Sequence, residues 1–281
     1  MMNSIQMSSV ILMVNGGMFK SNQLLTKYRS DDAMTISIFD NYWEKVAVSL
    51  EGAPSKTKAI QLSKTPRRFQ GVDVVTELSN ALVCRGWKSQ VGTNWNWSAD
   101  AKYITTSPEV VLERKIVEAG NGLWARQMST SSGIQGQWLN KRRAIDLVRA
   151  NGNDSYTFIE LKVESDNPLY AIFELLGYAL AYMHARNNGW KGTGTYNVMQ
   201  AKIIELVVLA PNKPENWYEY KTRGAKSECL LFKLGWLIEE LNKGLDTLTK
   251  GKVRMQISLK EFDFSKGATA DTAKSIISLK W

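Results

Sequence analysis

Residues 144–163, with the sequence AIDLVRANGNDSYTFIELKV, decide the fold that we expect for this chain. Two apolar runs, 144–150 and 156–163, lie on either side of the turn-forming residues 151–154. Runs rich in Ile, Leu, Val, Phe and Tyr around an Asn-Gly-Asn-Asp sequence predict two antiparallel strands joined by a tight turn. The first of these strands is expected to begin near residue 137.

Both predicted strands carry charged residues among their apolar ones. Glu160 and Lys162 are two residues apart, so they should project from the same face of the sheet. A three-residue loop, 152–154, would pair residues whose numbers sum to 306 and would set Asp146 opposite Glu160, with Cβ atoms about 4.5–5.5 Å apart. A four-residue loop would break this parity unless a bulge restored it.

Two adjacent carboxylates, Asp146 and Glu160, suit one divalent cation, and the backbone carbonyl of Leu161 could supply a further ligand. All three are oxygen ligands, which Mg²⁺ and Mn²⁺ prefer. Such a cation polarises a phosphoryl oxygen and lowers the pKa of water. Lys162 could orient or help deprotonate the attacking water, and could offset charge on the transition state. The three side chains therefore predict metal-dependent hydrolysis of a phosphodiester.

A structural ion pair at a sheet edge is the alternative interpretation. An acid-x-Lys triplet occurs four times in the chain, so the triplet alone is weak support for a catalytic site. Only Glu160-Leu161-Lys162 lies in a strongly apolar strand that follows an Asp-bearing strand and a tight turn. Buried charges are costly unless they pair or bind a metal, and the sequence leaves both outcomes open.

The remaining pattern predicts an α/β fold. Ser107-Pro108-Glu109 is typical of a helix start, and this helix should end at Gly120. Elements predicted after it are strands 123–128, 137–150 and 156–163, helix 167–186, strand 201–210 ending before Pro211, helix 228–248 and strand 253–264. The order is helix, three strands, helix, strand, helix, strand.

With these elements and residues, the segment from about 107 to 264 resembles the PD-(D/E)xK nuclease superfamily, which has a restriction endonuclease-like fold. Asp146 matches the first aspartate of the family motif, with Ile145 in place of the namesake proline, and Glu160 and Lys162 match the E-x-K half. The resemblance implies a three-strand meander between two helices. It also implies a Mg²⁺- or Mn²⁺-dependent nuclease, with DNA as the favoured substrate.

The resemblance also implies supporting residues on the neighbouring helices. A glutamate often lies on the helix before the meander. Glu113 is our choice, Glu109 and Glu118 are rivals, and a solvated acid is the alternative for each. A polar residue followed one turn later by Tyr often faces the site from the next helix. Glu174 and Tyr178 match these places, although Glu stands where many members have Gln.

The composition fits this interpretation. The chain of 281 residues has 36 Lys and Arg against 27 Asp and Glu, a net charge of +9, which favours a polyanionic partner. Two cysteines and one histidine argue against a zinc site and against any mechanism that needs two histidines. We expect no membrane span, no signal peptide and a reducing cytoplasm. Lys141, Arg142 and Arg143 could hold phosphates near the site, or form an exposed strand end.

We expect two regions, an N-terminal extension (1–106), mostly helical and loop, and a nuclease domain (107–281). Helices are predicted at 37–50 and 74–85. The basic stretch 56–68 could form a nucleic-acid surface with Trp95 and Trp97, or a solvated loop whose tryptophans serve the core. The patterns leave open a non-catalytic nucleic-acid-binding protein, a basic interaction protein, and a homodimer or partner protein.

Overall fold

The computed structural model describes residues 106–130, 144–163, 168–189, 196–212 and 230–281, the strands at 11–14 and 17–20, and residues 72, 75, 76, 79 and 95–97. Over these residues the protein has an α/β fold, as the sequence predicts. The predicted helix 37–50, the basic stretch 56–68 and residues 141–143 lie outside the described residues.

The centre of the fold is a mixed sheet of five described strands in the order β3-β4-β5-β6-β7. Strands β3, β4 and β5 form an antiparallel meander, and β5, β6 and β7 are parallel. Their bounds agree with the predicted strands to within a few residues, except that residues 137–143 of the second predicted strand are outside the description: β3 (Trp124–Ser129), β4 (Ala144–Gly152), β5 (Ser155–Leu161), β6 (Ile203–Pro211) and β7 (Arg254–Phe262).

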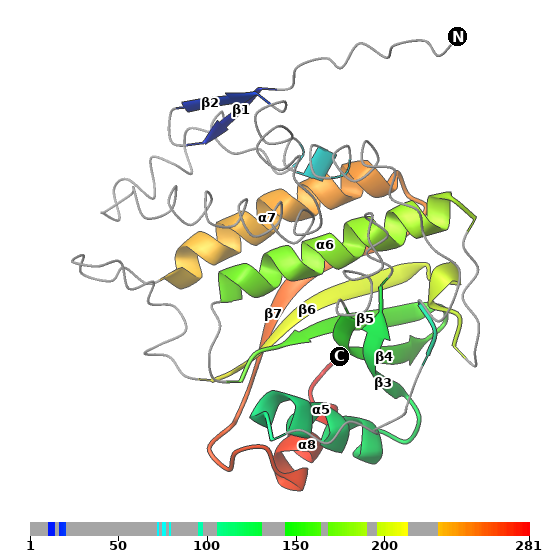
Figure 1. The fold of residues 1–281 in the computed structure, drawn as a ribbon, viewed down its shortest axis with the longest axis vertical. Helices are drawn as coiled ribbons and strands as arrows, with labels where there is room; N and C mark the ends of the chain where they lie inside the picture. Colours follow the sequence, from blue (N-terminus) through cyan, green and yellow to red (C-terminus); the bar gives the residue numbers. More distant parts are fainter. Residues whose placement is uncertain are drawn as a thin grey trace, which may run out of the picture.

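Helices cover both faces of this sheet (Figure 1). α6 (Pro168–Asn187) and α7 (Leu230–Thr249) connect the parallel strands and lie on one face, while α5 (Pro108–Ala119) and α8 (Ala270–Ile277) lie on the other. A short 3-10 helix, Val198–Gln200, precedes β6. A separate antiparallel pair, β1 (Ile11–Val14) and β2 (Gly17–Lys20), lies within the predicted N-terminal extension.

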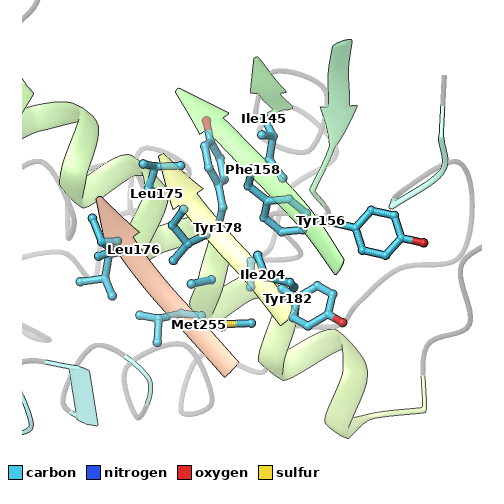
Figure 2. Packing of buried hydrophobic residues seen from close by; sticks show 14 of the residues in the cluster. Ile145, Tyr156, Phe158, Leu175, Leu176, Tyr178, Tyr182, Ile204 and Met255 are labelled. Carbon is cyan, nitrogen blue, oxygen red and sulfur yellow. The ribbon is translucent and has the colours of Figure 1, made fainter. Parts of the chain in front are cut away.

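Each face of the sheet has its own apolar core. The α6-side core combines strand residues such as Ile145 and Phe158 with Leu175, Leu176 and Tyr182 of α6 (Figure 2). The α5-side core joins α5 and α8 to the opposite face of the strands, through residues that include Leu147 and Ile159. Alternate residues of one strand therefore serve different cores, as a sheet buried on both faces requires.

Two tryptophans before residue 107, Trp95 and Trp97, pack with the α6-side core. Trp95 is 1% exposed and packs against Phe158 and Tyr182, with ring centroids 6.3 and 5.6 Å apart. Trp97 lies 4.5 Å from the ring of Tyr196. Trp95 therefore serves the core, which is one of the two alternatives that the sequence left open for it, and not the nucleic-acid surface.

α5 begins and ends at the predicted residues. Pro108 occupies its first turn and Gly120 caps its C-terminus. A Cβ atom at Gly120 would lie 2.2 Å from Cδ1 of Trp124, so the chain needs glycine to turn directly from α5 into β3. This close turn places the inner face of α5 against the first strand of the meander.

The β4–β5 hairpin has the predicted register, but it reaches that register by a different route. The four pairs from Leu147–Ile159 to Ala150–Tyr156 all sum to 306, as predicted, whereas the pair next to the turn, Gly152–Ser155, sums to 307. The turn is therefore a two-residue one, Asn153-Asp154, with φ values of 52° and 58°. A bulge between Ala150 and Gly152 absorbs the difference of one residue, so Asp146 still falls at the level of Glu160.

Candidate functional site

The candidate site lies where β3 and β4 both depart from regular alternation. Ala125 and Met128 are three residues apart, yet both belong to the α6-side core, and the same is true of Ile145 and Val148. The pairing of the strands nevertheless keeps one register across this point, because the pairs on both sides sum to 273. Gln127 and Asp146 lie at the irregularity, at opposed positions. Gln127 has a φ of 49°, which is rare for a residue other than glycine, asparagine or aspartate.

Glu160 and Lys162 lie at the end of β5 and share its α6 side. Nζ of Lys162 donates a hydrogen bond of 2.8 Å to Oε1 of Glu160. It also lies 3.0 Å from Oε2 of Glu174 on α6, an ion pair without the geometry of a hydrogen bond. The side chains of Lys162 and Glu160 are only 7% and 4% exposed, so this is a buried ion pair.

Asp146 joins the two strands through a side chain rather than through the backbone. Its Oδ2 accepts a hydrogen bond of 2.9 Å from the backbone amide of Leu161. The predicted role of Leu161, as a ligand through its carbonyl, stays a prediction. The structure instead assigns its amide to holding Asp146 beside Glu160.

Glu113 reaches the same place from α5. It is 1% exposed, and its Oε2 accepts a hydrogen bond of 2.9 Å from Nε2 of Gln127. The same Nε2 lies 3.4 Å from Oδ1 of Asp146. Of the two rivals, Glu118 pairs with Arg114 at 3.7 Å on the outer surface of the helix, and Glu109 is half-buried. Glu113 is therefore the α5 acid whose side chain bonds to Gln127 and so joins this cluster.

The four acids and Lys162 form a continuous polar cluster, and burial opposes ionisation of its acids. Burial, with a contribution from the charge of Asp146, raises the pKa of Glu113 to about 8. Burial raises the pKa of Asp146 to about 6, although Lys162 and the Leu161 amide act in the opposite direction. The pKa of Glu160 is raised well above its usual range by burial and by the charges of Asp146 and Glu174.

Lys162 remains charged within this cluster. Burial alone would lower the pKa of Lys162, but the carboxyls of Glu160, Glu174 and Asp146 outweigh burial and raise this pKa above its ordinary value. Lys162 therefore faces three acids, Glu160, Glu174 and Asp146, whereas Arg126 is the cation that acts on Glu113.

Asp146 and Glu160 are the residues of this cluster that could hold a hard divalent cation, because both carry carboxylate oxygens. Oε2 of Glu160 is buried and receives no hydrogen bond from the described residues, which is costly for a carboxylate unless a proton or cation meets it. Asp146 is only partly exposed. In the described part of the chain, no three His, Cys, Asp or Glu side chains gather closely enough to hold a metal ion among them. Asp146 and Glu160 would therefore act as a pair, and water and substrate oxygens would complete the coordination, as Mg²⁺ commonly requires.

The other predicted residues have different outcomes. The hydroxyl of Tyr178 donates to the backbone oxygen of Ala144 at 2.9 Å, so it holds the start of β4. Lys141, Arg142 and Arg143 fall outside the described residues, and their predicted contact with phosphates stays a prediction.

Two residues of β3 were not predicted from the sequence. Gln127 bridges two acids, and Arg126 is 2% exposed beside Glu113, with Nε and Nη1 lacking partners among the described residues. Neither could be found without the register between β3 and β4. The long intervening segment, residues 130–143, does not set that register.

Comparisons of the chain with protein-family models, with curated proteins and with solved structures found no match. Among the described helices, none has the combination of length and apolar character that a bilayer crossing needs.

Proposed function

We propose that this protein is a metal-dependent nuclease of the PD-(D/E)xK type, with a restriction endonuclease-like core and DNA as its favoured substrate. The observation that carries the proposal is the convergence of Asp146, Glu160 and Lys162 at neighbouring strand ends, with one buried oxygen of Glu160 left without a hydrogen bond. The order of the surrounding elements supports it, because α5, the β3–β5 meander, α6 and β6 follow the order that the resemblance implies.

In this proposal Asp146 and Glu160 hold Mg²⁺ or Mn²⁺. When bound, the cation supplies Lewis-acid polarisation of the phosphoryl group and a lower pKa for water. The Leu161 amide holds Oδ2 of Asp146, and the ammonium group of Lys162 holds Oε1 of Glu160. Each carboxylate therefore has one oxygen held by a defined partner, and this contact orients the whole group. Such second contacts fix the orientation of ligands.

Lys162 is the group that we assign to the water and to the transition state. Its contacts with Glu160 and Glu174 hold the ammonium group at the site and keep it charged. A fixed positive charge beside the reacting phosphate stabilises the negative charge that develops on the phosphoryl oxygens. Because its pKa is raised, Lys162 serves as an orienting donor and counter-charge in this account and not as the base.

Nucleic acid is the proposed substrate because the net charge of +9 favours a polyanion. Lys141, Arg142 and Arg143 immediately precede β4, the strand that carries Asp146. We propose that they bind phosphates on either side of the cleaved bond.

A non-catalytic protein is the second candidate, and one observation favours it. Lys162 contacts two carboxylates, so the cluster already contains the ion pair that a purely structural interpretation requires. In that case the cluster would stabilise the sheet, and the protein would bind nucleic acid without cutting it.

A cleavage assay over several substrates separates these candidates. Purified protein is incubated with plasmid, linear duplex, single-stranded DNA and RNA, with Mg²⁺, with Mn²⁺, and with EDTA. The nuclease proposal predicts cleavage that needs the cation, and the cleaved substrate defines the class. Salt-sensitive binding without cleavage of any substrate would support the non-catalytic candidate and contradict the nuclease.

A further inference from the structure

Gln127 occupies an unusual place in the candidate site. Its side chain is exposed, whereas its neighbours Arg126 and Met128 are buried. Its backbone has a φ of 49°, a conformation that costs a side-chain-bearing residue free energy in the absence of compensating contacts. Strain of this kind in a strand calls for an explanation in the contacts that the residue makes.

Those contacts are with two acids of the site. One atom, Nε2 of Gln127, donates to Oε2 of Glu113 at 2.9 Å and lies 3.4 Å from Oδ1 of Asp146. The two acids come from different elements, α5 and β4, and Gln127 comes from a third, β3. The Gln127 amide thus links the α5 acid to the aspartate.

The paired irregularity of β3 and β4 explains why Gln127 can make both contacts. Because Gln127 has a left-handed backbone conformation, Ala125 and Met128 can both enter the α6-side core. Gln127 therefore departs from the regular alternation of side chains along β3. Asp146, at the opposed position of β4, departs from it as well. A regular strand would place residues 125 and 127 on one face, so the amide would point into the α6-side core.

We propose that Gln127 is a positioning residue, whose amide directs Oδ1 of Asp146 and holds Glu113 toward the site. This role rests on the proposed nuclease function. It follows that Oδ2 of Asp146 is set by the Leu161 amide and Oδ1 by Gln127, so the rotation of this carboxylate is determined from both sides. Loss of such a positioning contact commonly lowers metal affinity or turnover by roughly 10- to 100-fold.

Two substitutions separate the amide from the backbone conformation. Gln127→Met removes the amide but keeps a long side chain at the left-handed position. Gln127→Gly removes the amide and also relieves the backbone, because glycine adopts positive φ freely. Asn121→Gly is the matched control, because Asn121 is an exposed carboxamide residue with a φ of 51° in the turn before β3.

The test measures kcat and KM for duplex DNA, and the Mg²⁺ concentration that gives half of the rise in Tm. Both Gln127 variants should lower kcat about tenfold or more or weaken Mg²⁺ binding by that factor, with little change in KM for DNA. Gln127→Gly should do so with a Tm in EDTA that is no lower than that of the wild type. Asn121→Gly should match the wild type in kcat, in KM for DNA and in the Mg²⁺ concentration at half of the rise in Tm.

Three outcomes would overturn the role. Wild-type kcat and Mg²⁺ dependence in both Gln127 variants would remove it while the nuclease function stands. Loss of activity in Gln127→Met but not in Gln127→Gly would assign Gln127 a backbone role only. A wild-type protein that shows neither Mg²⁺-dependent cleavage nor a Mg²⁺-dependent Tm would remove the proposed function, and this role with it.

Discussion

Lys162 and Lys243 make ion pairs of nearly the same length in very different surroundings. The Nζ of Lys162 lies 2.8 Å from Glu160 with both side chains almost fully buried, whereas the Nζ of Lys243 lies 2.7 Å from Glu240 and its side chain is 55% exposed. A buried pair contributes little net stability when intact, but removal of one partner leaves the other charge without compensation. The length of an ion pair therefore says little about the consequence of breaking it.

Lys162→Met should accordingly lower the free energy of unfolding in EDTA by about 3 kcal/mol, since Glu160 and Glu174 would be left to face one another. Lys243→Met should change it by less than about 1 kcal/mol. Urea unfolding followed by circular dichroism measures both. Equal losses in the two variants would contradict the burial of the Lys162 cluster.

The acids predict a particular dependence of stability on pH. The pKa of Glu113 is about 8 in the folded protein against 4.5 ordinarily, so the folded state binds the proton more tightly than the unfolded chain does. Stability in EDTA should therefore decrease as the pH rises from about 4.5 to about 8, by up to about 1.4 kcal/mol per pH unit. Asp146 adds to this decrease between its ordinary pKa of 3.8 and about 6.

Glu113→Gln should flatten the part of this profile between pH 6 and 8, because the amide does not titrate. Unfolding free energies at four pH values, for the wild type and the variant in EDTA, provide the comparison. A wild-type profile that rises between pH 6 and 8, or one that the substitution leaves unchanged, would show that Glu113 is not buried beside Asp146.

At the residue scale, the sequence predicted site residues best where a charged side chain interrupts an apolar strand. Asp146, Glu160 and Lys162 could be identified in this way, and the structure brings the three side chains together. Gln127 could not be identified in this way, because an exposed, uncharged glutamine in a short strand does not interrupt an apolar pattern. Its importance depends on the backbone conformation and on a register across a long intervening segment, which periodicity does not report.

The β4–β5 hairpin is the element that sets the spacing of the two strand acids. Its predicted register is confirmed, because the pairs nearest the site sum to 306, but a two-residue turn and a bulge replace the predicted three-residue loop. The apolar pattern predicted which faces must be buried, and burial determines the register. The pattern does not distinguish a longer loop from a shorter turn with a compensating bulge.

The turn provides a prediction at this scale. Asn153 and Asp154 both have positive φ values, and glycine is the preferred second residue of such a turn. Asp154→Gly should therefore be more stable than Asp154→Ala by about 1 kcal/mol, because both lose the exposed ion pair with Lys202 and only alanine keeps a Cβ. Thermal unfolding of the two variants compares them directly, and equal stabilities would argue against the two-residue turn.

The helices show where local signals are sufficient. α5 begins and ends as predicted because Pro108 and Gly120 act through local backbone constraints. The same local signals could not decide which of three acids on that helix faces the site. Only the packing of α5 against β3 distinguishes Glu113 from Glu109 and Glu118.

At the scale of the whole molecule, the net charge of +9 predicts nucleic-acid binding that weakens with salt. Replacing Lys141, Arg142 and Arg143 together by Gln should make the slope of log K against log salt shallower by up to about 2.7 for duplex DNA, if each contacts one phosphate. Lys243, Lys250 and Lys252, exposed residues of α7 and the turn after it, form a charge-matched control triple. Fluorescence anisotropy over a range of salt measures both slopes, and identical changes in the two triples would show that residues 141–143 have no special contact.

The described fold places its polar cluster at one end of a sheet whose two faces are otherwise filled by apolar cores. The cluster spans the sheet from α5, through β3, β4 and β5, to α6. This continuity is a property of the whole molecule, since no two neighbouring elements contain all of it.

The most direct test of the account compares the rate of DNA cleavage in Mg²⁺ by the wild type, Asp146→Asn, Lys162→Met and the surface control Lys243→Met. The assigned active site requires that the wild type and Lys243→Met cut at similar rates and that EDTA stops both. Asp146→Asn and Lys162→Met should be at least about 100-fold slower while still binding DNA. Cleavage by Asp146→Asn and Lys162→Met at the wild-type rate would contradict the assignment of the active site. No cleavage by the wild type on any of the tested substrates would contradict the proposed function.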